Sequence, residues 1–197
     1  MIKLTNHHDT REPWLLAVAK YAEVELFEPK GYTLPKYRVT CGFPHTGAFA
    51  AKKKRIGECW YPESSKDETT EIIVSMTVDD SRQAIGVLLH EMVHAAVGCG
   101  FGHGPVFRKC ALGIGLTGKM TATTESQTLV DDFISPVIKE LGGYPHARLD
   151  YSKRKKQGTR MVKIQCLNCG VIFRASRTVA DQCHTCPACL EQQLEIS

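Results

Sequence analysis

The 197-residue sequence lacks several features, and each absence narrows the class of protein. No apolar run approaches the roughly 20 residues that a membrane-spanning helix needs, so no membrane partner is expected. The first residues, MIKLTNHHDTREPW, lack the apolar segment of a secretory signal, so we expect a cytoplasmic protein. Internal repeats and low-complexity tracts are also missing, which argues against a repeat protein.

What the sequence does contain is an ordinary globular composition and many cysteines. Hydrophobic residues make up 43% and charged residues 23%, as in soluble domains, and the length allows a core of about 150 residues with a small appended module. The net charge of +4 is modest, so the distribution of charge matters more than its sum. In a reduced chain, the nine cysteines favour metal binding over disulfides wherever they come in pairs.

Hydrophobic periodicity and turn residues predict both helices and short strands. The expected helices lie at 10–27, 81–97, 105–112 and 125–141, and the expected strands lie at 37–41, 57–61 and 71–76. Asp9 or Thr10 should cap the first helix, the run Asp79-Asp80-Ser81 should supply the cap of the second, and Pro136 should kink or split the last.

Four basic residues follow one another between the first two expected strands. They are Lys52, Lys53, Lys54 and Arg55. This run is interpreted either as the solvated tip of a hairpin or as a phosphate contact. The second interpretation requires other basic segments on the same face of the protein.

The helix at 81–97 is apolar on nearly all sides, and three polar residues interrupt it. His90, Glu91 and His94 form an H-E-x-x-H pattern. Residues four apart lie on one helix face, so the two imidazoles can bind one cation, and Zn²⁺ suits such ligands. Glu91 is then placed to accept a proton from a water held by that metal, which would become a nucleophile near neutral pH.

Such short patterns also occur by chance in helices, but burying three unpaired polar groups would be costly, and a metal removes that cost. A catalytic zinc site needs a third protein ligand. His103 is the best candidate because the glycine-rich turn 98–102 lets the chain reverse before Pro105 opens the next helix. Glu125 is the alternative, by analogy with zinc peptidases that take a glutamate from a later helix.

The last segment carries a second set of candidate metal ligands. Cys166 with Cys169, and Cys186 with Cys189, form two C-x-x-C pairs, a spacing that suits a closed structural Zn²⁺ site in a zinc ribbon with a strand at 171–176. Cys183 or His184 is the alternative for one of the later positions. A redox role is less favoured, because the two pairs together complete a four-ligand set.

The chain between residues 148 and 163 is strongly basic. Its cations are Arg148, Lys153, Arg154, Lys155, Lys156, Arg160 and Lys163. Together with Arg174, the residues Lys153, Arg154, Lys155, Lys156 and Arg160 are candidates for contact with nucleic-acid phosphates, which would give salt-dependent binding. The alternative is a solvated linker beside a purely structural zinc module.

The stretch LLHEMVHAA, followed by a glycine-bearing turn and by His103, Gly104 and Phe107, resembles the SprT-like zinc metalloprotease family. That family includes Spartan-type proteases, which degrade proteins crosslinked to DNA. The resemblance extends to GECW at 57–60, to the strand at 72–75 and to the cysteine-rich tail, about residues 10–190. The runs GKMTAT at 118–123 and YPHAR at 144–148 are similar to SprT-like proteins of phages and prophages.

The resemblance implies an α+β, minigluzincin-like fold with three strands packed against the H-E-x-x-H helix. It implies a protease domain at 1–147, a basic linker at 148–160 and a zinc ribbon at 161–197. By position, His90, His94 and His103 would be the zinc ligands and Glu91 the catalytic base, with two zinc ions per chain. The protein would be nucleoid-associated, or in the host cytoplasm if phage-encoded.

Two functional hypotheses follow from the sequence. The first is a zinc metalloendopeptidase acting on proteins bound or crosslinked to DNA, with single-stranded or damaged DNA as a partner. The second is a DNA-binding or transcription-associated zinc protein whose H-E-x-x-H site is structural or weakly active. Glu91 favours the enzyme, because a purely structural site needs no carboxylate at that position.

Overall fold

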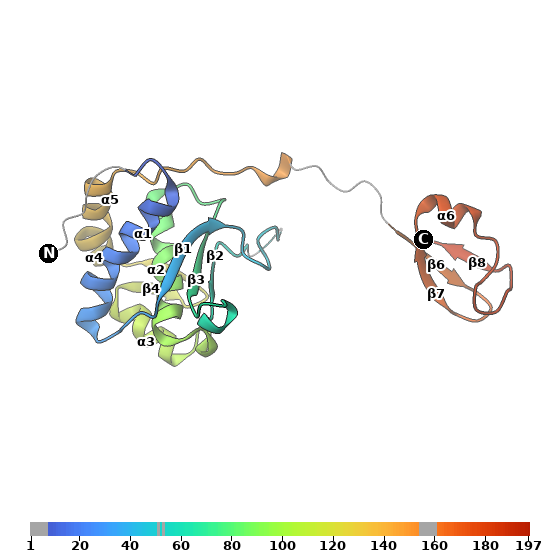
Figure 1. Ribbon diagram of the computed structural model, residues 1–197, viewed down its shortest axis with the longest axis horizontal. Helices are drawn as coiled ribbons and strands as arrows, with labels where there is room; N and C mark the ends of the chain where they lie inside the picture. Colours follow the sequence, from blue (N-terminus) through green and yellow to red (C-terminus); the bar gives the residue numbers. More distant parts are fainter. Residues whose placement is uncertain (1–7, 51, 53, 154–160) are drawn as a thin grey trace. The chain divides into compact units, whose positions relative to one another are not determined.

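The computed structural model describes residues 8–50, 52, 54–153 and 161–197, and it confirms an α+β protein. The chain divides into two compact units, residues 1–150 and 151–197 (Figure 1). Among the residues that the structure describes, no helix combines the length and apolar character needed to cross a membrane.

The N-terminal unit contains the helices and strands that surround the H-E-x-x-H segment. Its helices are α1 (Arg11–Ala22), α2 (Ser81–Val97), α3 (Pro105–Gly113), α4 (Gln127–Leu129) and α5 (Ser135–Leu141). Its strands are β1 (Tyr37–Gly42), β2 (Gly57–Trp60), β3 (Thr70–Ser75), β4 (Leu116–Lys119) and β5 (Ala122–Glu125). The three expected strands and the helices at 81–97 and 105–112 are therefore confirmed.

Local sequence explains where the central helix begins and ends. The Asp80 side chain accepts a hydrogen bond from the Gln83 backbone N–H at 2.8 Å, which caps the first turn of α2. Gly98 ends the helix with a φ of +92°, a backbone conformation that side chains disfavour. Thr10 occupies the corresponding capping position of α1, but its side chain makes no capping hydrogen bond.

The main sheet has the order β1-β3-β2, so β3 lies in the centre. β1 runs parallel to β3 and β2 runs antiparallel to it. Since β1 and β2 lie at opposite edges and are antiparallel to each other, the connection between them passes the end of β3 and does not form a two-stranded hairpin. The expectation that Lys52, Lys54 and Arg55 lie at a hairpin tip is therefore wrong; Lys53 lies outside the described residues.

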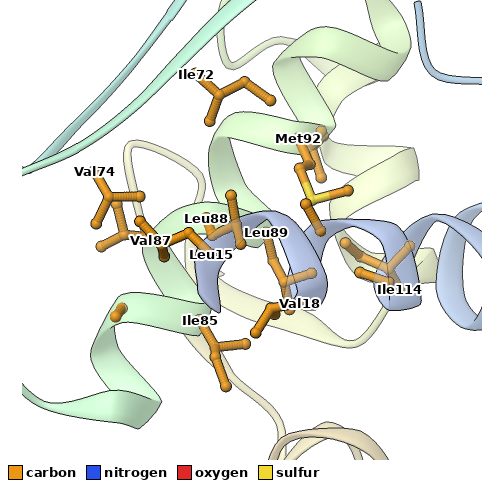
Figure 2. Close-up of a cluster of buried hydrophobic side chains, with 14 of the residues drawn as sticks. Leu15, Val18, Ile72, Val74, Ile85, Val87, Leu88, Leu89, Met92 and Ile114 are labelled. Atoms are coloured by element: carbon orange, nitrogen blue, oxygen red, sulfur yellow. The ribbon is translucent and has the colours of Figure 1, made fainter. Parts of the chain in front are cut away.

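Helix α2 forms the centre of the core. It packs against β2 and β3 on one side and against α1 and α3 on others. Its buried side chains meet those of α1 and β3, and Figure 2 shows this cluster of Leu15, Val18, Ile72, Val74, Ile85, Val87, Leu88, Leu89, Met92 and Ile114. A helix held on so many sides is a rigid support for the polar residues that it carries.

Two helical segments differ from the sequence expectation. The first helix continues past α1 as a π-helical turn, Glu23–Phe27, and the last helix contains another, Val130–Ile134, between α4 and α5. Pro136 lies in the first turn of α5, directly after this π-helical turn, so the helical path continues through it while the α-helical hydrogen bonding is interrupted before it, and the last helix is divided as expected. The last helix also begins at Gln127 rather than Glu125, because the β4–β5 hairpin precedes it.

The C-terminal unit is a small antiparallel sheet of order β7-β6-β8 with one short helix. Its elements are β6 (Val162–Cys166), β7 (Ile172–Ala175), α6 (Arg177–Gln182) and β8 (Leu194–Ile196), with a 3-10 turn, Tyr151–Lys153, near its start. The expected strand at 171–176 is present as β7, whereas β6, β8 and α6 were not anticipated.

Candidate metal centres

Three histidine side chains converge in the N-terminal unit. The Nε2 atom of His103 lies 3.1 Å from Nε2 of His90 and 3.2 Å from Nε2 of His94. Ligands at about 2.0–2.1 Å in a tetrahedral zinc site lie roughly 3.3 Å from one another. The three nitrogens therefore have nearly the spacing of ligands on one ion, and the group could hold a metal.

Each histidine is placed by a feature visible in the sequence. His90 and His94 lie one turn apart on α2 and so face the same side. After Gly98 the chain makes a 3-10 turn, Cys99–Phe101, and Gly102 adopts a φ of +50°. This compact reversal brings His103 back over α2 just before α3 begins.

Phe107 of α3 packs against all three imidazoles. Its ring centroid lies 5.0 Å from that of His90, 4.4 Å from that of His94 and 4.9 Å from that of His103. Phe107 is fully buried, so it forms an apolar wall that limits the rotation of the three rings. The sequence marked Phe107 only as a core residue and as part of the family resemblance.

Thr123 on β5 contacts the far side of His90. Its Oγ1 lies 2.9 Å from Nδ1 of His90. When Nδ1–H donates to the hydroxyl, Nε2 of the same ring carries a free lone pair toward the other histidines, which is the form a metal needs. Sequence reasoning missed this residue, because it depends on the β4–β5 hairpin that was not predicted.

Burial keeps the imidazoles neutral. Desolvation, followed by the neighbouring histidines, lowers the pKa of His90 to about 3. Desolvation, followed by His103 and Arg55, lowers the pKa of His94 to about 4. The pKa of His103 is also lowered, first by burial and then by Arg55. Neutral imidazole is the state that binds metal, so the site is prepared for a cation at neutral pH.

Glu91 lies beside the histidines in an almost closed environment. Its side chain is 6% exposed, and burial raises its pKa to about 8, with the Arg55 cation opposing only part of that shift. The carboxylate packs against the backbone of Gly57 on β2, where a Cβ atom would overlap it. Glu91 is thus a buried carboxyl group held in place by a strand that has no side chain at the point of contact.

Glu125, the alternative third ligand, lies elsewhere. Its Oε2 accepts a hydrogen bond from Nε of Arg82 at 3.1 Å, and its carboxylate covers Gly86, one turn before His90. The three-histidine group does not include it. In the described structure Glu125 fastens the β5 strand to α2 rather than joining the cluster.

Four cysteine sulfurs converge in the C-terminal unit. The Sγ atoms of Cys166 and Cys189 lie 3.7 Å apart, and those of Cys169 and Cys186 lie 3.6 Å apart. Sulfurs bound to zinc at about 2.3 Å in a tetrahedron lie roughly 3.8 Å apart, so this cluster also has the spacing for a metal.

Neither alternative ligand joins this cluster. Cys183 donates its thiol hydrogen to the Thr185 carbonyl at 3.5 Å, and His184 is exposed and stands outside the four-sulfur group. The two later positions are therefore occupied by Cys186 and Cys189.

The two C-x-x-C turns have matching backbones. Gly170 donates its N–H to the Cys166 carbonyl, and Leu190 donates to the Cys186 carbonyl, both at 2.9 Å. Each follows the second cysteine of its pair with a positive φ, +74° for Gly170 and +61° for Leu190. Leu190 is the exception to the usual preference, because a side chain in that conformation is strained.

The candidate nucleic-acid contacts are placed only in part. Lys163 and Arg174 are directly opposed on β6 and β7 and so share one face of the sheet. Lys153 lies in the 3-10 turn Tyr151–Lys153. The remaining candidates lie outside the described residues: Arg154, Lys155, Lys156 and Arg160.

Comparison of the chain with protein-family models, with curated proteins and with solved structures found no match. The two clusters and the residues around them are therefore the features that bear on function.

Proposed function

We propose that the protein is a zinc-dependent metalloendopeptidase with a minigluzincin-like catalytic domain and a C-terminal zinc ribbon. The observation that carries the proposal is the convergence of three neutral imidazoles beside a buried carboxylate, on one rigid helix and the turn that follows it. A structural site needs only the ligands. The adjacent base is the feature that chemistry requires.

His90, His94 and His103 would hold the zinc ion, and their Nε2 spacing of 3.1–3.2 Å fits one tetrahedral cation. Bound there, Zn²⁺ would acidify a water molecule and polarise a peptide carbonyl. Phe107 keeps the rings in place, and the Thr123 hydroxyl holds His90 in the tautomer that leaves Nε2 free.

Glu91 takes the proton in this proposal. Burial raises the pKa of Glu91 to about 8 in the metal-free site, and a cation held by the neighbouring histidines would lower it and so favour the ionised carboxylate that can accept a proton. Its carboxylate accepts the proton that the attacking water loses and then delivers it to the leaving amine. Its contact with Gly57 fixes the position from which both transfers occur.

Strand β2 offers a place for the substrate backbone. It is an edge strand of the sheet, and in the described part of the chain it pairs with β3 alone. Its other edge leaves backbone N–H and C=O groups for an extended peptide, as in strand addition. Because Gly57 of β2 touches Glu91, a peptide along this edge would pass close to the base.

We further propose that the substrates are proteins bound or crosslinked to DNA. The support is the paired Lys163 and Arg174 on the C-terminal sheet and the basic sequence at 148–163. Phosphate contacts of this kind are independent of base sequence and weaken with salt. They would concentrate the catalytic unit on protein that occupies DNA.

The test is proteolysis of a basic DNA-binding protein by the purified chain, with and without single-stranded DNA. The wild type is compared with Glu91→Gln at equal zinc content, measured by metal analysis. We expect cleavage by the wild type, two zinc ions in both proteins, and a loss of at least 10²-fold in the variant. Cleavage that survives the substitution would refute the assignment of the base.

A second candidate is a DNA-binding zinc protein in which the histidine site only supports the fold. The paired cations on the C-terminal sheet favour it independently of Glu91. Salt-dependent DNA binding that is equal in the wild type and in Glu91→Gln, with cleavage by neither, would select this candidate.

A further inference from the structure

Two cysteines outside both metal clusters lie against each other beside the histidine site. Cys59 on β2 and Cys99 in the turn after α2 have their Sγ atoms 3.3 Å apart and are hydrogen-bonded. Both side chains are partly buried, and both sulfurs are free thiols. The pair connects strand β2, which touches Glu91, with the turn that leads to His103.

We propose that Cys59 and Cys99 are a redox-active pair, which hydrogen peroxide converts into a disulfide that ties the His103 turn to strand β2. The proposal concerns the mechanical state of the site, and it holds whether or not the site hydrolyses peptides. Closing the bond requires the sulfurs to move from 3.3 Å to about 2.05 Å. That approach of about 1.3 Å is within reach of side-chain rotation in a short turn.

Cys99 is the thiol that reacts first. It lines an open pocket of about 490 Å³ together with Tyr61 and Glu63, and Cys59 is not among the residues that line this pocket. The hydrogen bond with Cys59 lowers the pKa of Cys99, while the same hydrogen bond and burial raise that of Cys59. The more accessible sulfur is therefore also the better nucleophile.

The reaction balances in two steps. The Cys99 thiolate attacks one oxygen of the peroxide, the O–O bond breaks, and the departing hydroxide takes up the thiol proton as water, leaving a sulfenic acid. The Cys59 sulfur then attacks the Cys99 sulfur, the S–O bond breaks, and the second water leaves with the Cys59 proton. Two thiols lose two electrons in total, and one peroxide becomes two waters.

The disulfide would affect the histidine site because Cys99 lies four residues before His103 in the same turn. Gly98 and Gly100 in this turn are exposed and Phe101 is 59% exposed, so few buried side chains of the turn itself hold it. A covalent link at Cys99 removes part of that freedom. The oxidised protein would hold His103 over α2 more firmly than the reduced protein.

The primary test is peptide mapping of the full zinc-loaded chain after brief exposure to hydrogen peroxide, with alkylation of the remaining thiols. Trypsin places Cys59 alone in peptide 56–66 and Cys99 alone in peptide 83–108, so a linked pair has one mass. We expect that linked pair in the wild type and in the matched control Cys41→Ser. Dithiothreitol should reverse it.

Two variants separate a paired reaction from general oxidation. In Cys59→Ser, Cys99 has lost the thiol that captures its sulfenic acid, so we expect it to gain two oxygens as sulfinic acid. In Cys99→Ser, Cys59 should remain largely unmodified. Recovery of peptides 56–66 and 83–108 only as separate species in the wild type would overturn the proposal.

Hydrogen exchange provides the mechanical readout. Backbone amides in residues 98–104 should exchange at least about tenfold more slowly in the oxidised wild type than in the reduced protein, since local opening then has to occur within a closed loop. The same treatment should leave exchange in Cys59→Ser unchanged. Equal exchange in the oxidised and reduced wild type would refute the link between the disulfide and the His103 turn.

Discussion

Replacing Gly57 by alanine tests how the base is held. A Cβ at position 57 would overlap the carboxylate of Glu91, and it would lie 2.9 Å from Cγ of Glu91 and 2.7 Å from Cγ1 of Val87. Gly57 does not adopt a positive φ, so alanine tolerates its backbone and the perturbation is purely steric. The buried Glu91 side chain has to move to make room.

The size of the effect follows from these contacts. Added methyl groups in a packed interior cost about 1–3 kcal/mol, which for a protein of this length lowers the Tm by roughly 2–10 °C. A displacement of about 1 Å at a catalytic group costs on the order of 10²-fold in rate. Under the proposed mechanism, Gly57→Ala should therefore reduce kcat/KM about 100-fold while the zinc content stays at that of the wild type, because the atoms nearest the added Cβ belong to Glu91 and Val87 and not to a histidine.

The assay combines peptide hydrolysis, thermal unfolding and metal analysis on the same preparations. Gly113→Ala at the end of α3 is the matched control, since a Cβ there meets no atom within 4 Å. It should change neither activity nor zinc content, and its stability should stay within about 1 kcal/mol of the wild type. A Gly57→Ala protein that is folded, zinc-loaded and within twofold of wild-type activity would refute the role given to the Gly57–Glu91 contact.

The remaining predictions concern pH, the hydroxyl behind a ligand and the cysteine turns. In chelator-treated protein, Glu91 with a pKa raised from 4.5 to about 8 keeps a proton that the unfolded chain releases, so stability falls as the pH rises toward 8. Between pH 6.5 and 8 the Glu91 contribution to this loss should be about 2 kcal/mol. It is measured by urea unfolding with tryptophan fluorescence as the difference between the wild type and Glu91→Gln, because the three histidines with lowered pKa act in the opposite direction in both proteins. Equal pH slopes in the two proteins would contradict the assignment. Thr123→Val should weaken zinc binding at the histidine site about 10-fold or more in competition with a chromophoric chelator, whereas Thr121→Val in the exposed hairpin turn should not. Leu190→Gly should stabilise the C-terminal unit by about 1 kcal/mol, because glycine adopts the positive φ of this position without steric strain. Gly170→Ala should destabilise the unit by a similar amount for the opposite reason. Protease resistance of residues 161–197 measures both changes, and equal resistance in the wild type and the variants would show that neither turn is strained.

The parts of the site that sequence could predict are those with fixed spacing. His90 and His94 are four apart on a helix whose apolar pattern is unmistakable, and the cysteine pairs carry their geometry in the C-x-x-C interval. His103 was predictable because glycines at 98–102 allow a reversal. These are local rules, and they place side chains without knowledge of the rest of the fold.

The residues that sequence could not predict act across long intervals. Thr123 reaches His90 through a two-stranded hairpin of polar, weakly patterned residues, and Gly57 meets Glu91 across strand and helix. The sequence likewise does not predict the parallel pairing of β1 with β3, since strands that follow one another in the sequence, such as β1 and β2, suggest a hairpin. Such contacts are set by tertiary packing, which produces no characteristic residue spacing in the sequence.

The central position of α2 also limits which parts of the sequence can change during evolution. Substitutions on that helix disturb the core and the histidine cluster together, because its buried apolar side chains lie on the same turns as His90 and His94. The β4–β5 hairpin contacts the site through Thr123, and the connection between β1 and β2 carries Arg55, whose charge lowers the pKa of His94. Under the proposed function, we expect inherited variation in substrate preference to accumulate in those two segments, while α2 stays nearly constant.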